Sequence, residues 1–281
     1  MIVGIPFNPL SPTLSARLTT KAQERAIPYR QLHLPTLRIA GSEITDMNGQ
    51  VTITHLAPGT TYGENEAHEA LIHLEASGVV ALNPLNACSV ADDKIRTCEA
   101  LRSAGLRQPR WEVVHAGDIA ALSRFGYPLV VKRPTGALGM WNRLAHDKAG
   151  AITALDELLA EGGDRLLVQE LVREALGRSL RVVVLQDRVL AVTELVAEAG
   201  EWRSNGALGA TGYDVTPTET ERELAIAGLS AVGLGYGGVD LLRAADGPVL
   251  IEVNAGSSFD GAERRTGQDI AGALLDALLA L

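Results

Sequence analysis

The sequence predicts a chain that begins as an α/β fold and continues as an α+β fold. Up to about residue 84, short apolar runs alternate with amphipathic segments, which is typical of strands alternating with helices. Beyond Pro109, apolar runs lie close together and are joined by short polar turns. Of the 281 residues, 46% are hydrophobic and 21% are charged, so the chain can bury a sizeable core.

The first part of the chain is expected to be a small parallel α/β unit that ends near Asn83 and Pro84. Strands that alternate with helices favour parallel pairing, because each helix carries the chain back across the sheet. The predicted strands are 2–5, 29–34, 51–56 and 79–82, and the predicted helices are 15–25 and 64–77.

A linking helix is predicted over residues 92–104. Ile95, Cys98 and Leu101 are spaced to share one face, and Gly105 is suited to end the helix. The α+β elements follow. Strands are predicted at 112–114, 129–132, 166–169, 180–185, 189–194, 238–242 and 248–254, and helices at 149–161, 217–232 and 269–279.

The last two of these strands are predicted to form a hairpin around Asp246. In such a hairpin Asp240 lies opposite Glu252, and Asn254 shares their face because side chains alternate along a strand. Burying two carboxylates together is costly unless a cation neutralises them. Oxygen ligands suit a hard ion such as Mg²⁺. Taken alone, an edge hairpin with two solvent-facing acids fits this segment nearly as well.

Lys132 ends an apolar strand and precedes a loop that contains Gly136 and Gly139. A lysine in this position needs a partner or an exit to water. Glycine lets the backbone approach a ligand closely, and successive backbone amides can bind phosphate oxygens. A Gly-x-x-Gly segment alone is more typical of a plain hairpin turn. Lys132 beside it favours a phosphate clamp, although the sequence is not that of a Walker loop.

The apolar strand at 166–169 ends in polar residues, Gln169 and Glu170, followed by Leu171 and Val172. Backbone groups at such a strand end can pair with the edge of an adenine, while flanking apolar side chains hold its ring. A core strand that runs into a loop explains the same pattern equally well.

In order and spacing, these segments resemble the ATP-grasp superfamily, in particular the branch of the ribosomal-protein glutamate ligase RimK and the lysine-biosynthesis ligase LysX. The resemblance runs from about Asn83 to the C-terminus. It implies a Rossmann-like domain over residues 1–84, a linker helix with the central ATP-grasp lid domain over 85–175, and a C-terminal ATP-grasp domain over 176–281. The motifs that carry it are Asp93-Lys94, Val131-Lys132, the glycine loop, residues 169–172, Arg181, Arg203-Ser204-Asn205, Gly238-Val239-Asp240, Glu252-Val253-Asn254 and residues 266–270.

The resemblance implies an ATP-dependent ligase that joins a carboxylate to an amine through an acyl phosphate. The implied cofactors are ATP and Mg²⁺, with two ions expected and Mn²⁺ as an acceptable substitute. For Arg181, an ion pair within its own hairpin is about as good an interpretation as a catalytic role. The implied ATP-binding residues are Lys94, Lys132, Gly136, Gly139, Gln169, Glu170, Leu171, Val172 and Ser179; the implied metal ligands are Asp240, Glu252 and Asn254; and the implied catalytic residues are Arg203, Asn205 and Arg181.

Three positions depart from the pattern of these relatives. Ser179 stands where they usually carry an acid that contacts the ATP ribose. Glu194-Leu195-Val196 replaces a stretch in which the glutamate and aminoadipate ligases have arginines, and residues 205–210 lack an expected basic residue. Because those cationic groups suit acidic substrates, their absence predicts a less anionic substrate.

Composition restricts the partners. The net charge of −9 argues against nucleic acid and against an anionic membrane surface, and no apolar run reaches membrane-spanning length. The chain begins without a positively charged leader, and its two cysteines, Cys88 and Cys98, fit a reducing cytoplasm. The expected substrate is an amino acid, a small peptide or a molecule bound to a carrier protein, and the resemblance implies a homodimer or homotetramer.

Two other functions are compatible with the same fold: a phosphotransferase that makes a stable phosphoester, and a non-catalytic nucleotide-binding regulator. The set of Asp240, Glu252 and Asn254 argues against the regulator, because ATP binding alone rarely needs such dense metal ligation. The sequence does not favour a dinucleotide-dependent oxidoreductase, because no Gly-x-Gly-x-x-Gly motif follows the first predicted strand.

Overall fold

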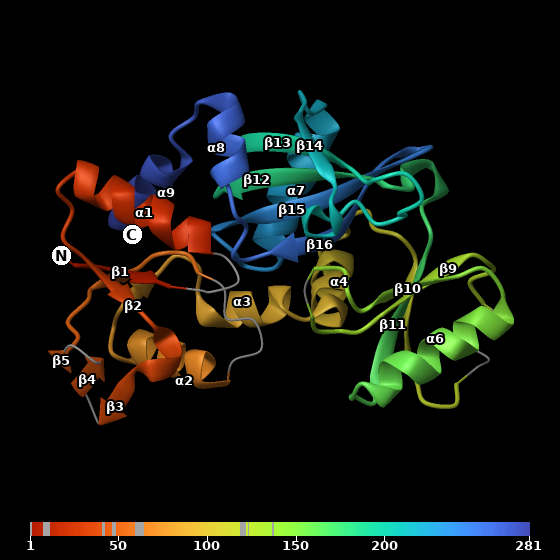
Figure 1. The fold of residues 1–281 in the computed structure, drawn as a ribbon, viewed down its shortest axis with the longest axis horizontal. Helices are drawn as coiled ribbons and strands as arrows, with labels where there is room; N and C mark the ends of the chain where they lie inside the picture. Colours follow the sequence, from red (N-terminus) through yellow and green to blue (C-terminus); the bar gives the residue numbers. More distant parts are fainter. Residues whose placement is uncertain are drawn as a thin grey trace.

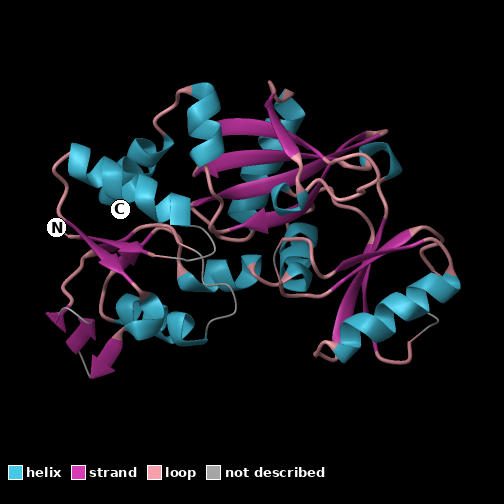
Figure 2. Cartoon of the chain, in the orientation of Figure 1, coloured by secondary structure: helices cyan, strands magenta, loops and turns pink. Residues whose placement is uncertain are grey.

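The computed structural model describes residues 2–7, 12–40, 43–46, 49–59, 65–118, 122, 124–136 and 138–281. Over these residues the chain forms four β-sheets with helices packed against them (Figure 1, Figure 2). In Figure 1 the N-terminal sheet lies at the left, a five-stranded sheet at the top centre and a second four-stranded sheet at the right. The α/β and α+β fold predicted from the sequence is confirmed. Within the described ranges, no helix is both long enough and apolar enough to cross a membrane.

The N-terminal unit is a parallel sheet in the order β2-β1-β6-β7, as predicted. Val3 and Ile5 are fully buried and pack with the helices above the sheet. A small antiparallel sheet of β3, β4 and β5 was not predicted. The elements are β1 (Val3–Pro6), α1 (Pro12–Glu24), β2 (Tyr29–Leu32), β3 (Arg38–Ala40), β4 (Glu43–Asp46), β5 (Gly49–Gln50), β6 (His55–Leu56), α2 (Asn65–Ala76) and β7 (Val80–Ala81).

Three predicted strands are shorter in the structure, and the one predicted at 79–82 pairs only at Val80–Ala81. The strand predicted at 29–34 ends at Leu32, because a 3₁₀ turn, η1 (Leu34–Thr36), follows with Pro35 in its first turn, where a missing N–H costs least. The strand predicted at 51–56 pairs only at His55–Leu56. Val51 and Ile53 are nevertheless buried, so the apolar pattern of this segment reflects burial and not pairing with a neighbouring strand. The start predicted for the next helix, Glu64, lies outside the described residues.

The linker contains two helices where one was predicted. The first, α3 (Leu85–Ala91), was not predicted, and the second is α4 (Lys94–Ser103). They are separate because the Asp93 side chain caps α4, accepting hydrogen bonds from the backbone N–H groups of Ile95 and Arg96. Ile95, Cys98 and Leu101 are buried as predicted, and Gly105 ends the helix region at φ +68°.

The second four-stranded sheet is antiparallel in the order β10-β9-β11-β8. Helix α6 covers one of its faces and is capped by Asp147. On the other face Leu167, Trp111 and Val113 pack against Ile95 and Cys98 of α4. This second face therefore turns toward the linker. The elements are β8 (Trp111–His115), β9 (Leu129–Lys132), β10 (Asn142–Ala145), α6 (Lys148–Ala160) and β11 (Arg165–Glu170).

The five-stranded sheet is antiparallel in the order β14-β13-β12-β15-β16. One face packs on α3, α4 and α7, whose first turn is closed by a capping box between Thr218 and Glu221. Part of the other face packs on α1 and α9, and this places the two ends of the chain close together (Figure 1). The elements are η2 (Arg173–Ala175), β12 (Arg178–Leu185), β13 (Arg188–Val196), η3 (Gly206–Leu208), β14 (Thr211–Asp214), α7 (Glu219–Ala231), β15 (Tyr236–Ala244), β16 (Gly247–Asn254), α8 (Asp260–Thr266) and α9 (Ile270–Leu279).

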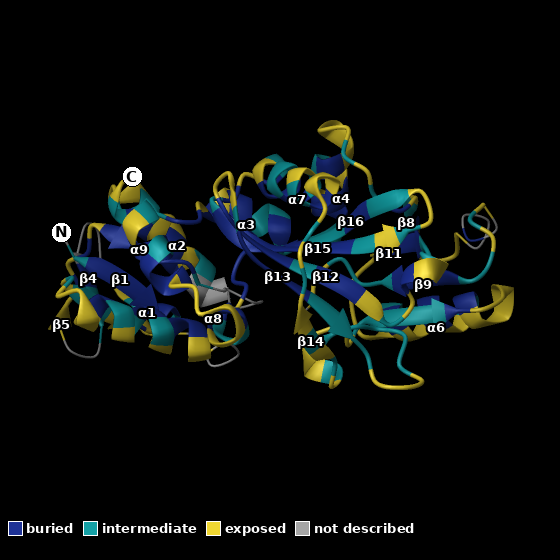
Figure 3. Cartoon of the chain, turned by 90° about the horizontal axis from the view of Figure 1, so that it is seen from above, coloured by how far each residue is buried: buried dark blue, intermediate teal, exposed yellow. Residues whose placement is uncertain are grey.

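The centre of this sheet is largely buried, and Figure 3 shows β12 and β15 mostly in the colour of buried residues. Both hairpins of the sheet were predicted with the correct partners. The turn between β12 and β13 is formed by Gln186 and Asp187, with Gln186 at φ +54°. Strand β14 and helix α8 were not predicted.

Candidate functional site

The hairpin of β15 and β16 presents its acids as the sequence predicted. Asp240 pairs directly with Glu252, and Gly238 pairs with Asn254, so the three oxygen-bearing side chains share one face. Asp240 is 6% exposed. The Asn254 amide donates to Asp240 Oδ2 at 3.2 Å, which draws the members of the set together.

Cations of the protein neutralise both acids. Arg181 of β12 lies opposite Asp240 in the sheet and binds both of its carboxylate oxygens, with Nη2 2.8 Å from Oδ2. The Lys94 ammonium lies 3.1 Å from Glu252 Oε1. An ion-pair partner of Arg181 is thus Asp240 of β15, outside the hairpin of β12 and β13. Each carboxylate is thus bound by a cation, which offsets the cost of removing the negative charge from water.

The charge state of this cluster follows from its surroundings. Burial alone would raise the pKa of the Glu252 carboxyl, but Lys94 and Lys132 outweigh it and hold that pKa below its ordinary value. Burial lowers the pKa of the Lys132 ammonium, although the nearby Glu252 acts in the opposite direction. Lys132 and Glu252 come from different sheets, so their interaction means that the two sheets face a common space.

Gly238 is required at its position by close packing. A Cβ atom there would overlap the side chain of Ser257 and would lie 2.9 Å from Cδ of Arg181. The absence of a side chain therefore lets Arg181 lie flat against β15 and reach Asp240.

Across the shared space, the end of β11 holds the second set of predicted residues. Lys132 donates to Gln169 Oε1 at 2.7 Å, and within the described part of the chain the buried Nε2 of Gln169 has no partner. The Glu170 carboxylate pairs with Arg110 at 2.7 Å, and the Glu170 backbone N–H donates to the Arg110 carbonyl oxygen. Its side chain is thus directed to Arg110 and away from the metal-ligand set.

The glycine loop is held from both sides. Gly136 has φ +121° and Gly139 has φ +70°, conformations that favour glycine. Lys94 Nζ donates to the Gly136 carbonyl at 2.8 Å, and Arg203 Nη1 donates to the Gly139 carbonyl at 2.9 Å. Lys94 therefore connects the loop to Glu252, and Arg203 connects it to the segment before η3. Ala137, in the same loop, lies outside the described residues.

Glu201 is a site residue that the sequence analysis missed. Its carboxylate accepts hydrogen bonds from the backbone N–H, Nε and Nη2 of Arg203 at 2.8, 2.9 and 2.8 Å. The side-chain hydrogen bond from Arg203 lowers the pKa of Glu201 to about 2. The one available signal was a Glu two residues before an Arg in an extended segment, which is a common pattern and not a specific one.

Asn205 and Ser179 have structural partners. Asn205 Oδ1 accepts from the backbone N–H of Ala207 and begins the 3₁₀ turn η3. The Ser179 hydroxyl is buried and accepts a hydrogen bond from the Ser204 hydroxyl at 2.7 Å. Where the resemblance expects a ribose-binding acid, the chain thus has a serine already bonded to a second serine.

Glu194 does not face the site. It lies opposite Leu180, on the face of the sheet covered by α7, and it pairs there with Arg178 at 3.1 Å and Arg243 at 3.7 Å. Its neighbours Thr193 and Leu195 occupy the other face, opposite Arg181 and Ser179. Of the segment 194–196, Leu195 thus shares the face of the candidate site.

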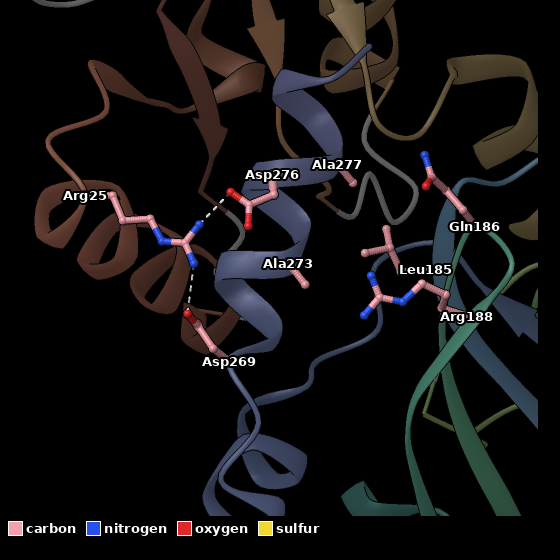
Figure 4. A pocket seen from close by; sticks show the side chains of 8 residues that line it. All are labelled: Arg25, Leu185, Gln186, Arg188, Asp269, Ala273, Asp276 and Ala277. Carbon is pink, nitrogen blue, oxygen red and sulfur yellow. Dashed lines mark hydrogen bonds and ion pairs between the residues drawn. The ribbon is translucent and has the colours of Figure 1, made fainter.

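Two surface cavities lie elsewhere. One of about 320 Å³ lies between α1, α9 and the turn of β12 and β13, where Arg25 is bonded to Asp269 and Asp276 and Arg188 lies on the opposite wall (Figure 4). Another of about 430 Å³ lies between α1, α8 and the start of α9. Neither is lined by a residue predicted for the site. The candidate site is therefore defined by contacts between the two sheets, where Lys94 binds both Glu252 and the Gly136 carbonyl.

The donor chemistry of the site suits a hard ion. Over the described residues, no group of three or more His, Cys, Asp and Glu side chains is placed to hold a metal. The candidate set is instead two carboxylates and one amide oxygen, all on one strand pair. Oxygen ligands of this kind, next to cations that can bind phosphates, are the combination in which Mg²⁺ is held with a nucleotide.

Comparisons with known proteins point to one family. Residues 91–278 match the family described as RimK-like ATP-grasp domain. A probable alpha-L-glutamate ligase of Enterobacter sp. (strain 638) is 34% identical over 267 residues, covering 93% of this chain and 83% of that protein. A ribosomal protein bS6–L-glutamate ligase of Salmonella paratyphi B is 37% identical over 209 residues, covering 73% of this chain and 69% of that protein.

A solved structure shares the fold. The ATP-grasp ligase PsnB, complexed with a minimal precursor, Mg and ADP, has a TM-score of 0.73 and 21% identity, covering 99% of this chain and 97% of that chain. At this identity the likeness concerns the fold alone. It extends over the N-terminal unit as well as the two sheets that face the candidate site.

Proposed function

Because the chain belongs to the RimK-like ATP-grasp family and is therefore an ATP-dependent carboxylate–amine ligase, we propose that its two facing sheets hold Mg²⁺ and ATP and form an amide bond through an acyl phosphate. The observation that carries this proposal is the set of Asp240, Glu252 and Asn254 on one strand pair, connected through Lys94 to the glycine loop.

ATP and Mg²⁺ are the cofactors of the family, and the residues of this chain fit them. Asp240, Glu252 and Asn254 would hold two Mg²⁺ ions. Bound Mg²⁺ neutralises the developing charge on the transferring phosphoryl group. Lys94 and Lys132 would bind phosphate oxygens, with Gly136 and Gly139 providing backbone contacts.

The end of β11 would hold the adenine. Gln169 and Leu171 would lie beside the ring, and backbone groups of Glu170 and Val172 would pair with its edge. The Glu170 N–H already donates to Arg110, so this assignment concerns the Glu170 carbonyl oxygen. Ser179 would lie near the ribose as a neutral hydroxyl, and an acid is lacking there.

The proposed reaction has two steps. A substrate carboxylate attacks the γ-phosphate of ATP and gives an acyl phosphate and ADP; an amine then attacks the acyl carbon and releases phosphate. Arg203 would offer its guanidinium to the acyl phosphate, since a planar donor pair suits clustered oxygens. Arg181 would do the same once a metal ion binds Asp240, and Asn205 would add an amide donor. No covalent intermediate with the protein is needed.

The substrates are proposed from the relatives. One named relative joins L-glutamate to a ribosomal protein, and PsnB has been solved with a precursor peptide. We therefore propose a carboxylate on a peptide or protein and an amino acid as the amine, with a carrier-protein-bound acceptor as the alternative. A cytoplasmic location and a dimer or tetramer stay predictions from the sequence.

The experiment is a screen of amino acids, singly and with short peptides, for ADP and phosphate release in the presence of Mg²⁺, followed by mass spectrometry of the products. Hydroxylamine is added in parallel, because an activated carboxylate is trapped as a hydroxamate. We expect a hydroxamate and an amide product. A stable phosphoester without hydroxamate would show a phosphotransferase instead, and nucleotide binding without any turnover would show a regulator.

Glu252→Gln tests the metal set directly. The variant keeps the shape of the side chain but loses the charge, so we expect turnover to fall by at least about a hundredfold while the thermal midpoint stays near that of the wild type. Asp246→Asn is the matched control, because Asp246 lies at the exposed turn of the same hairpin and should be dispensable. Wild-type turnover in the Glu252 variant would contradict the metal site.

A further inference from the structure

The glycine loop exposes two large apolar side chains. Leu138 is 46% exposed and Met140 is 52% exposed, and they lie on either side of Gly139 in the sequence. Large apolar side chains that are exposed close together often mark the place where another molecule binds. The proposed function gives no role to either side chain.

The backbone of Leu138 adopts a conformation that leucine disfavours. Its φ is +62°, in the left-handed region, where a residue with a large side chain is uncommon. The loop is held on both sides of it, by the bond from Lys94 to the Gly136 carbonyl and the bond from Arg203 to the Gly139 carbonyl. Residues held in such conformations are frequent where proteins bind ligands. Glycine would suit this backbone better, so what the leucine provides here is its side chain.

The two side chains flank the contact with Arg203, the residue proposed to bind the acyl phosphate. Arg203 Nη1 donates to the carbonyl oxygen of Gly139 at 2.9 Å, and Gly139 lies between Leu138 and Met140. A substrate carboxylate that binds Arg203 therefore lies next to the loop. The part of the substrate closest to Leu138 and Met140 is then the side chain of the residue that carries this carboxylate.

Other apolar side chains lie around Arg203. Its Cζ atom is 5.7 Å from the ring centre of Trp202, which is half-buried. Leu208 of η3 lies against the loop, since a Cβ atom at Gly139 would be 3.7 Å from Leu208 Cδ1. Leu195 stands where arginines were expected, on the face of the sheet that carries the candidate site. The neighbourhood of Arg203 is thus suited to an apolar group.

The charges near Arg203 do not favour an acidic side chain on the substrate. Glu201 already neutralises the guanidinium, accepting from its Nε and Nη2 at 2.9 and 2.8 Å. Glu198 lies beside η3, because a Cβ atom at Gly209 would be 2.9 Å from Glu198 Oε1, and it forms no ion pair within the described part of the chain. Glu198 would repel a carboxylate side chain, whereas an apolar side chain would not be repelled.

We propose that Leu138 and Met140 bind a large apolar side chain on the residue that carries the reacting carboxylate. The carboxylate substrate is then a peptide or protein segment that ends in a residue such as leucine or phenylalanine. This inference rests on the proposed function and adds the chemical class of one substrate. Contact between the apolar side chains of the loop and of the substrate removes both from water, and this is the source of the preference.

The test compares three peptides, Ala-Gly-Leu, Ala-Gly-Ala and Ala-Gly-Glu, as substrates in the presence of ATP, Mg²⁺ and hydroxylamine. Hydroxylamine takes the place of the amine substrate, so the hydroxamate formed measures activation of the peptide carboxylate alone. The peptides differ only in their last side chain. We expect kcat/KM for Ala-Gly-Leu to exceed that for each of the other two peptides by at least about tenfold.

Leu138→Gly separates the side chain from the backbone. Glycine adopts a φ near +62° without strain, so the loop should keep its conformation and the thermal midpoint should stay near that of the wild type. The preference for Ala-Gly-Leu over Ala-Gly-Ala should fall to less than about threefold, and it should disappear when Met140→Ala is added. Ile72→Ala is the matched control, since Ile72 is 48% exposed on α2 of the N-terminal unit. It should keep the preference of the wild type.

Several results would overturn the inference. A wild type without the preference, or a preference that survives in the double variant, would do so. An equal loss for all three peptides, with a parallel rise in the Kd for ATP, would show that the two side chains close over the nucleotide instead. If these peptides give no hydroxamate but another carboxylate does, the inference fails and the proposed function stands. No hydroxamate from any carboxylate overturns both.

Discussion

At the scale of single residues, the candidate site is a set of acids and cations that bind one another. Asp240 has Arg181, Glu252 has Lys94, and Arg203 has Glu201. Each pairing holds a residue of the candidate site in place and compensates a charge that burial would otherwise make costly. Binding of Mg²⁺ to the acids would release Arg181 and Lys94, which would then be available to bind the phosphates of ATP. The metal ion would thus replace these two side chains as the partner of the acids.

Nucleotide affinity should depend on the protonation of Lys132. Burial lowers the pKa of Lys132 in the folded protein, so this ammonium loses its proton at a lower pH than an exposed lysine. Only the protonated form attracts phosphate, and the Kd for ATP should therefore rise as pH is raised from about 7 toward about 10. Calorimetric titrations across this range check it. Lys132→Arg, which stays charged, should show a much smaller rise, and an equal rise in both proteins would assign the effect to another group.

Glu201 should act on catalysis through Arg203. Glu201→Gln removes the charge that holds the guanidinium by two hydrogen bonds, so kcat should fall by about tenfold to a hundredfold while the Kd for ATP changes little. Steady-state kinetics beside nucleotide titrations separate the two quantities. Glu201→Asp, which keeps the charge, should recover part of the loss. Equal losses in kcat and in ATP affinity would show that Arg203 serves only to hold the nucleotide.

At the scale of elements, two pieces of backbone shape the site: the hairpin of β15 and β16, and the glycine loop. The hairpin places Asp240 and Glu252 opposite each other by register alone. The loop depends on long-range contacts, since Lys94 holds Gly136 from the linker and Arg203 holds Gly139 from the segment before η3. The hairpin is thus rigid because of the sheet, whereas the conformation of the loop depends on side chains that ATP would also bind.

Gly136→Ala should disturb the loop without unfolding the protein. Gly136 has φ +121°, and a Cβ atom there would lie 2.5 Å from Cδ1 of Trp141. An alanine in this backbone conformation is strained by about 1–3 kcal/mol, and the loop would shift to relieve the strain. The shifted loop should bind ATP about tenfold more weakly. Gly163→Ala is the matched control, since Gly163 has φ +102° in open space. An equal loss of ATP affinity in the control would contradict the assignment of the loop.

At the scale of the whole molecule, the N-terminal unit is joined to the five-stranded sheet at two places. Helices α1 and α9 share one hydrophobic core with Val183, Leu185 and Tyr236. The side chain of Asn83 forms the second junction: it donates to the carbonyl oxygens of Tyr236 and Ala255 and accepts from the backbone N–H groups of Gly235 and Tyr236. The start of β15 and the end of β16 are therefore fixed to the linker. The division of the chain at residues 84 and 175 stays a prediction.

Asn83→Ala should destabilise the protein as a whole. It removes the side chain that bonds four backbone groups, three of them buried, at 2.8, 3.0, 2.9 and 2.7 Å. We expect the free energy of unfolding in urea to fall by about 3 kcal/mol or more. Asn86→Ala is the control, because Asn86 is exposed and bonds only its neighbour Ala87 among the described residues, so its loss should cost less than about 1 kcal/mol. Similar losses in both variants would show that Asn83 is not a junction.

The sequence by itself determined the parts of this protein that depend on local pattern. Alternation along two apolar runs placed Asp240 opposite Glu252, and helical spacing placed Ile95, Cys98 and Leu101 in the core. Turn residues defined both hairpins of the large sheet. Together with the order of the motifs, this was enough for the fold class and for the family.

Only the tertiary structure decided which charges meet. The pairing of Arg181 with Asp240, of Lys94 with Glu252, and of Arg265 with Thr193 joins residues that are far apart in the chain. Such contacts depend on how strands from separate hairpins lie side by side and on how α8 folds back over them. No local period in the sequence encodes that arrangement, because it results from burying all the apolar faces at once.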